Sequence, residues 1–590
     1  MKDFLKYVLA TVTGILMVAI VMGILGAISL VGLAASSAST TEVEDNSVFV
    51  LSLSGTLEER AKDDPLAFLT GQVSENLGLD KILASIQKAK DNENIKGIYI
   101  EAGAFAAGSP ASMHAIREAL LDFKKSGKWI VAYGDSYTQA TYYISSVADK
   151  VFMNPQGMVD WHGLGGETYY LRDLLAKVGV RFRAVKVGKY KSAVEMLTSD
   201  HMSEYDREQT ECYINGIWKV MLDDVSKSRK ISVDSLNAYA DRGITFADVN
   251  EFVKLKFVDK LLYTDEVKGE VKKLLKMDSD DDIKQVSLGD MDGVKGKKEK
   301  GEKIAVYYAY GDIVDSETGG VVNDDHSIVA TTVCKDLEKL MNDDDVKAVV
   351  LRVNSPGGSA YASEQIWRSV VNLKAKKPVV VSMGGYAASG GYYISCAANY
   401  IYSEPTTITG SIGIFGMFPD VSSLLTDKLA IKFDMVKTNK FADFGAASRP
   451  FNADEIALLE NYIGRGYELF RKRVADGRKL PVEKVEEIAQ GRVWLGNDAL
   501  GIKLVDGIGS LDDAVKKAAQ LAKVDEYYTT DYPDEPGWLE SLTSSVSKDN
   551  YLDEKLQETL GDYYTPFTYM KKVSQQSAVQ ARLPYIVVIK

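Results

Sequence analysis

A serine at position 389 lies where a predicted strand gives way to a predicted helix, a place where a hydroxyl can act as a nucleophile. The apolar run PVVVSMGG at 378–385 is typical of a strand, and GGYYI at 390–394 begins a helix. Backbone N–H groups at a helix N-terminus have no partner within the helix, and the helix dipole is positive there. The segment favours a nucleophile and an ordinary N-cap serine about equally.

A second element, Asn354-Ser355-Pro356-Gly357-Gly358-Ser359, also follows a predicted strand. Paired glycines adopt backbone conformations that other residues avoid, so they can aim an amide N–H at an oxyanion. A tight Pro-Gly-Gly turn is the plain alternative. With Ser389, the glycines would suit acyl transfer through a serine nucleophile.

A serine nucleophile needs a base. No histidine is near either element in sequence, but His326 remains possible because sequence distance does not exclude contact. A lysine can serve if burial lowers its pKa from about 10.4 until the neutral amine accepts a proton. Lys186, Lys189 and Lys191 follow a predicted strand, and composition does not separate them. A solvated basic edge is the plain alternative.

These residues belong to a chain that repeats itself. The run GGYAASGGYYISCAANYIYSEP ends at Pro405 and GDSYTQATYYISSVADKVFMNP ends at Pro155, so the register is 405 − 155 = 250 without a gap. At this register Ser389 faces Gln139. At a register of 251 the Pro-Gly-Gly element at 356–358 faces the run FAA at 105–107, so the copy with the serine also has the glycines, which favours a functional role for both.

The lysine segment shows the opposite asymmetry. After a one-residue slip the register becomes 251, as the alignment of Phe433 with Phe182 shows. Lys191 then faces Ala442. Neither half therefore keeps both a serine and a lysine. One site would draw on both halves, within one protomer or across an interface.

Both halves open with an alternating strand, VFVLSLSG at 48–55 and IAVYYAYG at 304–311, and then alternate helices with short apolar strands. This order predicts an α/β fold with a mostly parallel sheet in each half. The expected domains are a membrane anchor at 1–41, a first repeat at 46–275, a charged linker at 276–303, a second repeat at 304–524 and a C-terminal tail at 525–590. The tail contains a predicted helix at 552–563 and an apolar run at 585–589, to which we assign no chemistry.

Composition excludes some classes of function. The 70 basic and 83 acidic residues give a net charge of −13 without a dense basic stripe, so we expect no nucleic-acid partner. Three cysteines are too few and odd in number for a disulfide framework, and we expect buried free thiols. No metal-ligand spacing joins them to the four histidines, so we expect no metal and no cofactor.

The N-terminal region predicts a single membrane crossing. Residues 7–35 carry no charge, and as a helix they would span about 43 Å. Lys2 and Lys6 precede this run and acidic residues follow it, so the N-terminus should lie in the cytoplasm and the body outside. A cleaved signal peptide ending near Ser36-Ser37-Ala38 is the rival, but the apolar run is longer than such peptides have.

Three motifs together resemble the signal peptide peptidase A family in its long, two-domain bacterial form. They are NSPGG at 354–358, YAASGGYY at 386–393 and TGSIG at 409–413. The run KYKSAVE at 189–195 is similar to the segment that carries the family's general-base lysine, which falls here on Lys191.

The resemblance implies tandem ClpP/crotonase-like domains, a homotetramer on the outer side of a bacterial cytoplasmic membrane, and a serine endopeptidase. Its substrates would be signal peptides left in the membrane and other membrane-associated apolar peptides. Ser389 would be the nucleophile and Lys191 the base. Gly357, Gly358 and Gly390 would form the oxyanion hole, with Gly357 shaping the turn, and Ser411 would orient the lysine. The counterpart of Ser411 in the first half is Trp161.

Two other classes of function remain open at this level. One is a crotonase-like enzyme that uses the same backbone donors on thioesters. The other is a non-catalytic membrane scaffold in which both halves have lost activity.

Overall fold

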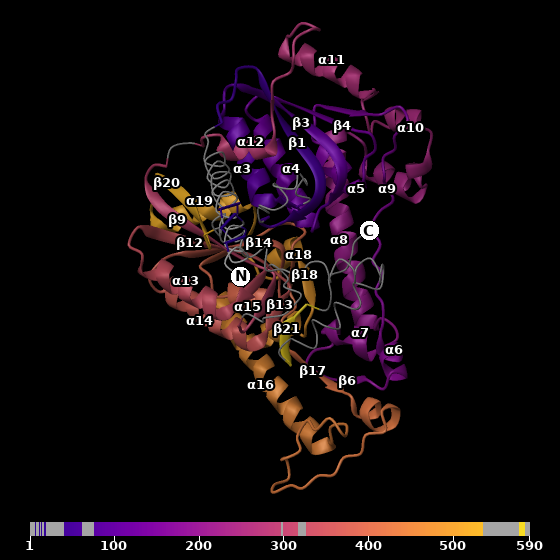
Figure 1. The fold of residues 1–590 in the computed structure, drawn as a ribbon, viewed down its shortest axis with the longest axis vertical. Coiled ribbons are helices and arrows are strands. Elements are labelled where there is room, and N and C mark those ends of the chain that lie inside the picture. Colours follow the sequence, from indigo (N-terminus) through magenta and orange to yellow (C-terminus); the bar gives the residue numbers. More distant parts are fainter. Residues whose placement is uncertain are drawn as a thin grey trace.

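The structure, a computed structural model, shows two α/β units joined through a shared sheet (Figure 1). It describes residues 6–7, 11, 13–14, 17–18, 41–61, 76–296, 299–316, 326–534 and 578–583. The predicted membrane segment at 7–35 lies mostly outside these residues, and the predicted helix at 552–563 and the apolar run at 585–589 lie wholly outside them. Within the described ranges, no helix has the length and apolar character needed to cross a membrane.

The first unit is built on a parallel sheet. Its strands lie in the order β2-β1-β3-β4-β5-β7, and β8 adds to β1. Parallel strands are covered by helices on both faces, which explains why β4 and β5 are almost wholly buried. The bounds are β1 Ser47–Glu58, β2 Asn76–Gly78, β3 Ile95–Ala106, β4 Trp129–Gly134, β5 Lys150–Met153, β7 Lys260–Leu261 and β8 Gln285–Val286.

The second unit repeats this arrangement. The parallel run β9-β12-β14-β15-β19 corresponds to β1-β3-β4-β5-β7. β14 begins at Val379 and β4 at Trp129, and 379 − 129 is again 250, as the sequence repeat predicts. The bounds are β9 Glu302–Tyr310, β12 Val346–Ser355, β14 Val379–Ala388, β15 Tyr400–Ser403, β16 Ile408–Gly410, β18 Val493–Leu495, β19 Gly507–Ile508 and β20 Tyr527–Tyr532.

Several helices of the first half also have an equivalent in the second. The longest pair, α8 and α16, both begin after a side-chain N-cap, Ser203 or Asn452, and both end at a left-handed lysine, Lys230 or Lys479. In the first half the bounds are α3 Leu79–Asp91, α4 Pro110–Lys124, α5 Gln139–Ser145, α6 Arg172–Lys177, α7 Glu195–Thr198, α8 Glu204–Arg229, α9 Val233–Asp241, α10 Val249–Lys254, α11 Thr264–Leu275 and α12 Leu288–Gly293. In the second half they are α13 Ala330–Asn342, α14 Ala360–Lys374, α15 Gly390–Ser395, α16 Ala453–Arg478, α17 Val482–Ile488, α18 Gly496–Gly501 and α19 Leu511–Ala522.

A third sheet joins the halves in the order β11-β10-β13-β21-β17-β6. Its strands are β11 Ser327–Val329, β10 Asp312–Val314, β13 Gly357–Ser359, β21 Val579–Arg582, β17 Phe415–Asp420 and β6 Arg181–Lys186. β6 belongs to the first half by sequence, but it pairs antiparallel with β17 of the second half. The residues that follow β6 are therefore delivered into the second unit.

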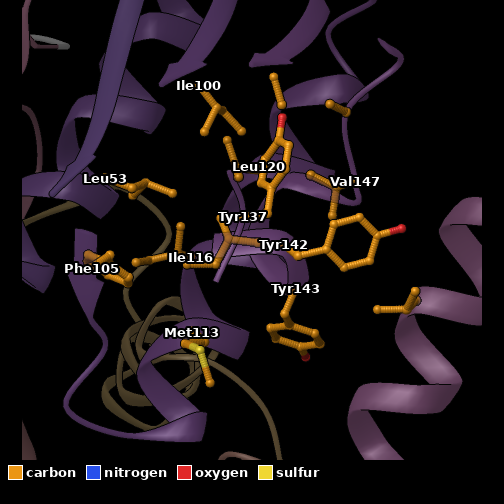
Figure 2. Packing of buried hydrophobic residues seen from close by; sticks show 14 of the residues in the cluster. Leu53, Ile100, Phe105, Met113, Ile116, Leu120, Tyr137, Tyr142, Tyr143 and Val147 are labelled. Carbon is orange, nitrogen blue, oxygen red and sulfur yellow. The ribbon is translucent and has the colours of Figure 1, made fainter. Parts of the chain in front are cut away.

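Each unit has its own hydrophobic core. In the first, Tyr137, Tyr142 and Tyr143 gather with aliphatic side chains from β1, β3 and α4 (Figure 2). Trp161 is fully buried in the same cluster, against Tyr142 and Trp218.

The expected linker at 276–303 is partly packed rather than exposed. β8 pairs with β1, and Met291 on α12 is buried in the first core. The expected tail likewise contributes β20, which pairs with β9 and extends the second sheet. Short pairing segments such as these have too few apolar residues to stand out in a charged sequence.

The three thiols are free, as expected, but only Cys396 is buried. Cys334 is half-buried, and Cys212 on α8 is exposed, so the prediction of a buried thiol was wrong for Cys212. α8 presents one long face to solvent, and Cys212 lies on it.

Candidate active site

Ser389 lies at the junction of β14 and α15 in a strained backbone conformation. Its φ is 53° and its ψ is −110°. A non-glycine residue rarely adopts positive φ, and such strain persists only where the surroundings impose it. The Ser389 N–H donates to Gly410 O at 2.8 Å. The side chain makes no cap hydrogen bond to the helix, so the plain N-cap role does not apply.

Lys191 meets Ser389 within one chain. Lys191 Nζ lies 2.8 Å from Ser389 Oγ, and it donates to Ser411 Oγ at 3.0 Å and to Ser411 O at 3.1 Å. All three residues are fully buried. Burial lowers the pKa of the Lys191 ammonium well below its ordinary value. The neutral amine can therefore accept a proton from the serine hydroxyl.

Glycines bring the lysine segment close to the loop before β18. Gly188 and Gly491 both have positive φ, at 98° and 80°. A Cβ built on Gly491 would lie 2.7 Å from the Lys191 backbone nitrogen, and one on Gly188 would lie 2.4 Å from Gln490 O. Any side chain at either glycine would push the two loops apart and move the lysine.

The other candidate bases lie elsewhere. Lys186 pairs with Glu195 at 3.4 Å, and Lys189 Nζ lies 4.9 Å from the centre of the Tyr205 ring. His326 Nε2 is 2.9 Å from Glu58 Oε2. The structure thus separates three lysines that composition could not.

The glycine pair lies beside the helix that follows the serine. Gly357 and Gly358 have φ of 103° and 158°. The Gly357 N–H donates to Ser355 Oγ at 3.1 Å, so this donor holds the turn. A Cβ on Gly357 would lie 2.8 Å from Gly390 N, which shows how closely the two loops approach. The N–H groups of Gly358 and Gly390 are the donors suited to an oxyanion.

Glu59 of the first half supports this loop, and sequence reasoning missed it. Its carboxylate accepts from Arg352 Nε at 2.5 Å and from Asn354 Nδ2 at 2.8 Å. Asn354 Oδ1 in turn accepts from Tyr386 N at 3.0 Å. Asn354 stands in the NSPGG motif, but no sequence signal links it to a residue 295 positions away.

The equivalent place in the first half has no such arrangement. Gln139 replaces the serine, and its Oε1 accepts from His162 N at 3.2 Å and Gly163 N at 3.1 Å. Trp161 fills the position of Ser411 and is part of the aromatic core. Ala442, the counterpart of Lys191, is exposed between β17 and α16.

Comparisons with known proteins agree with this division into repeats. A family model described as peptidase family S49 matches residues 122–278 and 371–525, and a Clp protease model matches residues 301–407. Protease 4 of Salmonella typhi is 39% identical over 485 residues, covering 81% of this chain and 77% of that protein. Protease 4 of Haemophilus influenzae is 35% identical over 516 residues, covering 84% and 82%. The chloroplastic serine protease SPPA of Arabidopsis thaliana is 30% identical over 487 residues, covering 82% and 70%.

Proposed function

The chain belongs to peptidase family S49 as a long member with tandem Clp protease-like domains and is a serine peptidase, and on this premise we propose that Ser389 and Lys191 form its catalytic dyad. The 2.8 Å contact between Lys191 Nζ and Ser389 Oγ is the observation that carries the proposal. The burial that lowers the pKa of Lys191 supports its role as base.

In the proposed mechanism, Ser389 Oγ attacks the carbonyl carbon of the scissile peptide bond while Lys191 Nζ takes the hydroxyl proton. The N–H groups of Gly358 and Gly390 stabilise the negative charge on the carbonyl oxygen. Lys191 returns the proton to the leaving amine, and the C–N bond breaks. Water, activated by the same amine, then hydrolyses the acyl-serine ester. Ser411 keeps the lysine amine directed at Ser389.

The proposed substrates are signal peptides that remain in the cytoplasmic membrane and other apolar peptides of the membrane. Residues 7–35 would anchor the chain in the bilayer, with the N-terminus in the cytoplasm and the peptidase body on the outer side. This topology would keep the site near peptides that are themselves apolar and membrane-bound.

We also propose that the chain forms a homotetramer. The segment between β17 and α16 projects from the body (Figure 1). It exposes large apolar side chains, among them Phe433 at 49% and Val436 at 96%. Exposed apolar patches of this kind are typical of surfaces that contact another protein or a membrane, and we assign this one to another copy of the chain.

The repeat indicates which surface this arm would meet. β6 at 181–186 corresponds to residues 432–437 at the register of 251, and β17 at 415–420 corresponds to residues 165–170 at the register of 250. Within one chain β6 pairs with β17. The same contact between copies would place residues 432–437 of one chain beside residues 165–170 of the next. Such a head-to-tail contact produces a ring when the rotation closes.

Hydrolysis of an apolar peptide by the purified full chain in detergent tests the dyad. We expect Ser389→Ala to abolish hydrolysis. Lys191→Arg should lower kcat by about 10²–10⁴-fold, because a guanidinium does not give up its proton at ordinary pH. Lys189→Arg is the matched control and should retain activity. Full activity in Lys191→Arg would contradict the proposed dyad.

A further inference from the structure

A strand from the end of the chain lies in the sheet beside the proposed catalytic groups. β21 stands between β13 and β17 and pairs antiparallel with both. On one side Gly357 faces Arg582 and Gly358 faces Ala581, and on the other Phe415 faces Gln580. Without β21, the facing edges of β13 and β17 would present unpaired backbone groups to any extended peptide.

The register places the carbonyl of Ala581 at the glycines. The Leu583 N–H donates to Pro356 O at 2.7 Å. Hydrogen-bonded pairs alternate along an antiparallel ladder, so the next such pair is Gly358 with Ala581, in which the Gly358 N–H is expected to donate to Ala581 O. The proposed oxyanion donor is therefore directed at a carbonyl of the chain itself.

A second observation locates the same oxygen. A Cβ built on Gly357 would lie 2.1 Å from Ala581 O, and one built on Gly390 would lie 3.0 Å from it. The Ala581 carbonyl thus lies between the glycine loop and the first residue of α15. A scissile carbonyl would occupy this place in the proposed mechanism.

The side chains of β21 hold it in place. Ala581 is fully buried in the core of the second unit, and Leu583 is 5% exposed in the core of the first. Arg582 Nη2 forms an ion pair with Asp312 Oδ2 at 2.9 Å. The strand continues past Ala581, so it lies across the site as an uncut peptide would.

We propose that the peptide-binding groove lies between β13 and β17. Residues 579–583 occupy this groove as an internal competitor of substrate. The position of Ala581 marks the subsite for the residue before the scissile bond, and its buried methyl group indicates a small side chain there. The inference rests on the proposed function, because it takes Ser389 as the nucleophile.

Kinetics of the full chain and of a chain ending at Ser577 test the proposal. With a short peptide that has alanine before the scissile bond, removal of β21 should lower KM about tenfold and leave kcat unchanged. A tenfold change is expected if the tethered strand has an effective concentration in the millimolar range and a dissociation constant of about 0.1 mM for the groove. A synthetic peptide VQARL, which copies residues 579–583, should restore the higher KM when added to the shortened chain.

A milder variant covers the case in which the shortened chain does not fold. Arg582→Ala removes only the ion pair to Asp312 and should lower KM about two- to fivefold, in line with a partly exposed pair. Arg242→Ala breaks an exposed ion pair with Glu251 in the first unit and serves as the control.

The outcomes separate the two proposals. Hydrolysis that depends on Ser389 but shows the same KM in the full chain, the shortened chain and Arg582→Ala would overturn the internal competitor. Absence of any hydrolysis that depends on Ser389, in the full and the shortened chain alike, would overturn the proposed function and the competitor with it.

Discussion

At the scale of residues, burial distinguishes the proposed base from its neighbours. Lys186, Lys189 and Lys191 are alike in sequence, but only Lys191 is fully buried and reaches a serine hydroxyl. The sequence indicates Ser389 and the glycine pair through local strand and turn signals. Composition offers no such signal for Lys191, which only the family resemblance of the run at 189–195 singles out, because its burial arises from the pairing of β6 with β17 more than 200 residues away.

The lowered pKa of Lys191 has a consequence for stability. The folded chain holds this lysine neutral at pH values where the unfolded chain keeps it protonated, so the unfolded state binds more protons and the free energy of unfolding rises with pH. This rise continues until the pH reaches the unfolded pKa of about 10.4. Lys191→Met should remove this part of the pH dependence. The free energy of unfolding of the variant, relative to that of the parent, should therefore be highest near neutral pH and lower near pH 10.

Urea denaturation at pH 7 and pH 9 measures this effect. Lys189→Met is the matched control, because it makes the same substitution two positions away at an exposed lysine, whose amine lies over the Tyr190 and Tyr205 rings. If the free energies of unfolding of the parent and Lys191→Met differ by the same amount at both pH values, Lys191 is charged in the folded chain and the account of its burial is wrong.

At the scale of elements, strands that cross between units build the site. β6 brings the lysine segment, β13 carries the glycines, and β21 fills the space between β13 and β17. The repeated strands and helices could be predicted from their periodicity. β21 could not, because it is four residues long with two polar side chains and its partners are distant in sequence.

The projecting arm gives a prediction at this scale. In the proposed homotetramer, Phe433 and Val436 lie against the next copy, so the double substitution Phe433→Glu and Val436→Glu should reduce the mass of the particle to that of one chain. Light scattering of the full chain in detergent measures this. Phe246→Glu is the control, because Phe246 is 91% exposed on the first unit outside the arm. An unchanged mass in the double variant would exclude the arm as the interface.

At the scale of the whole molecule, duplication has produced two units with unequal roles. The second unit holds the serine and the glycine loop, while the first supplies Lys191 and supports Asn354 through Glu59. The sequence predicts this division from the substitutions at Gln139, Trp161 and Ala442. The support from Glu59 appears only when the two units are packed together. We therefore expect one catalytic site per chain.

The most direct test of this account is the mass of the full chain after reaction with a serine-reactive fluorophosphonate, with the site located by peptide mapping. One label per chain, on Ser389, is expected. Its rate should rise with pH as Lys191 loses its proton, and Lys191→Met should slow it by about 10²–10⁴-fold. Two labels per chain, a label on another residue, or an undiminished rate in Lys191→Met would contradict a Ser389–Lys191 site built from both halves.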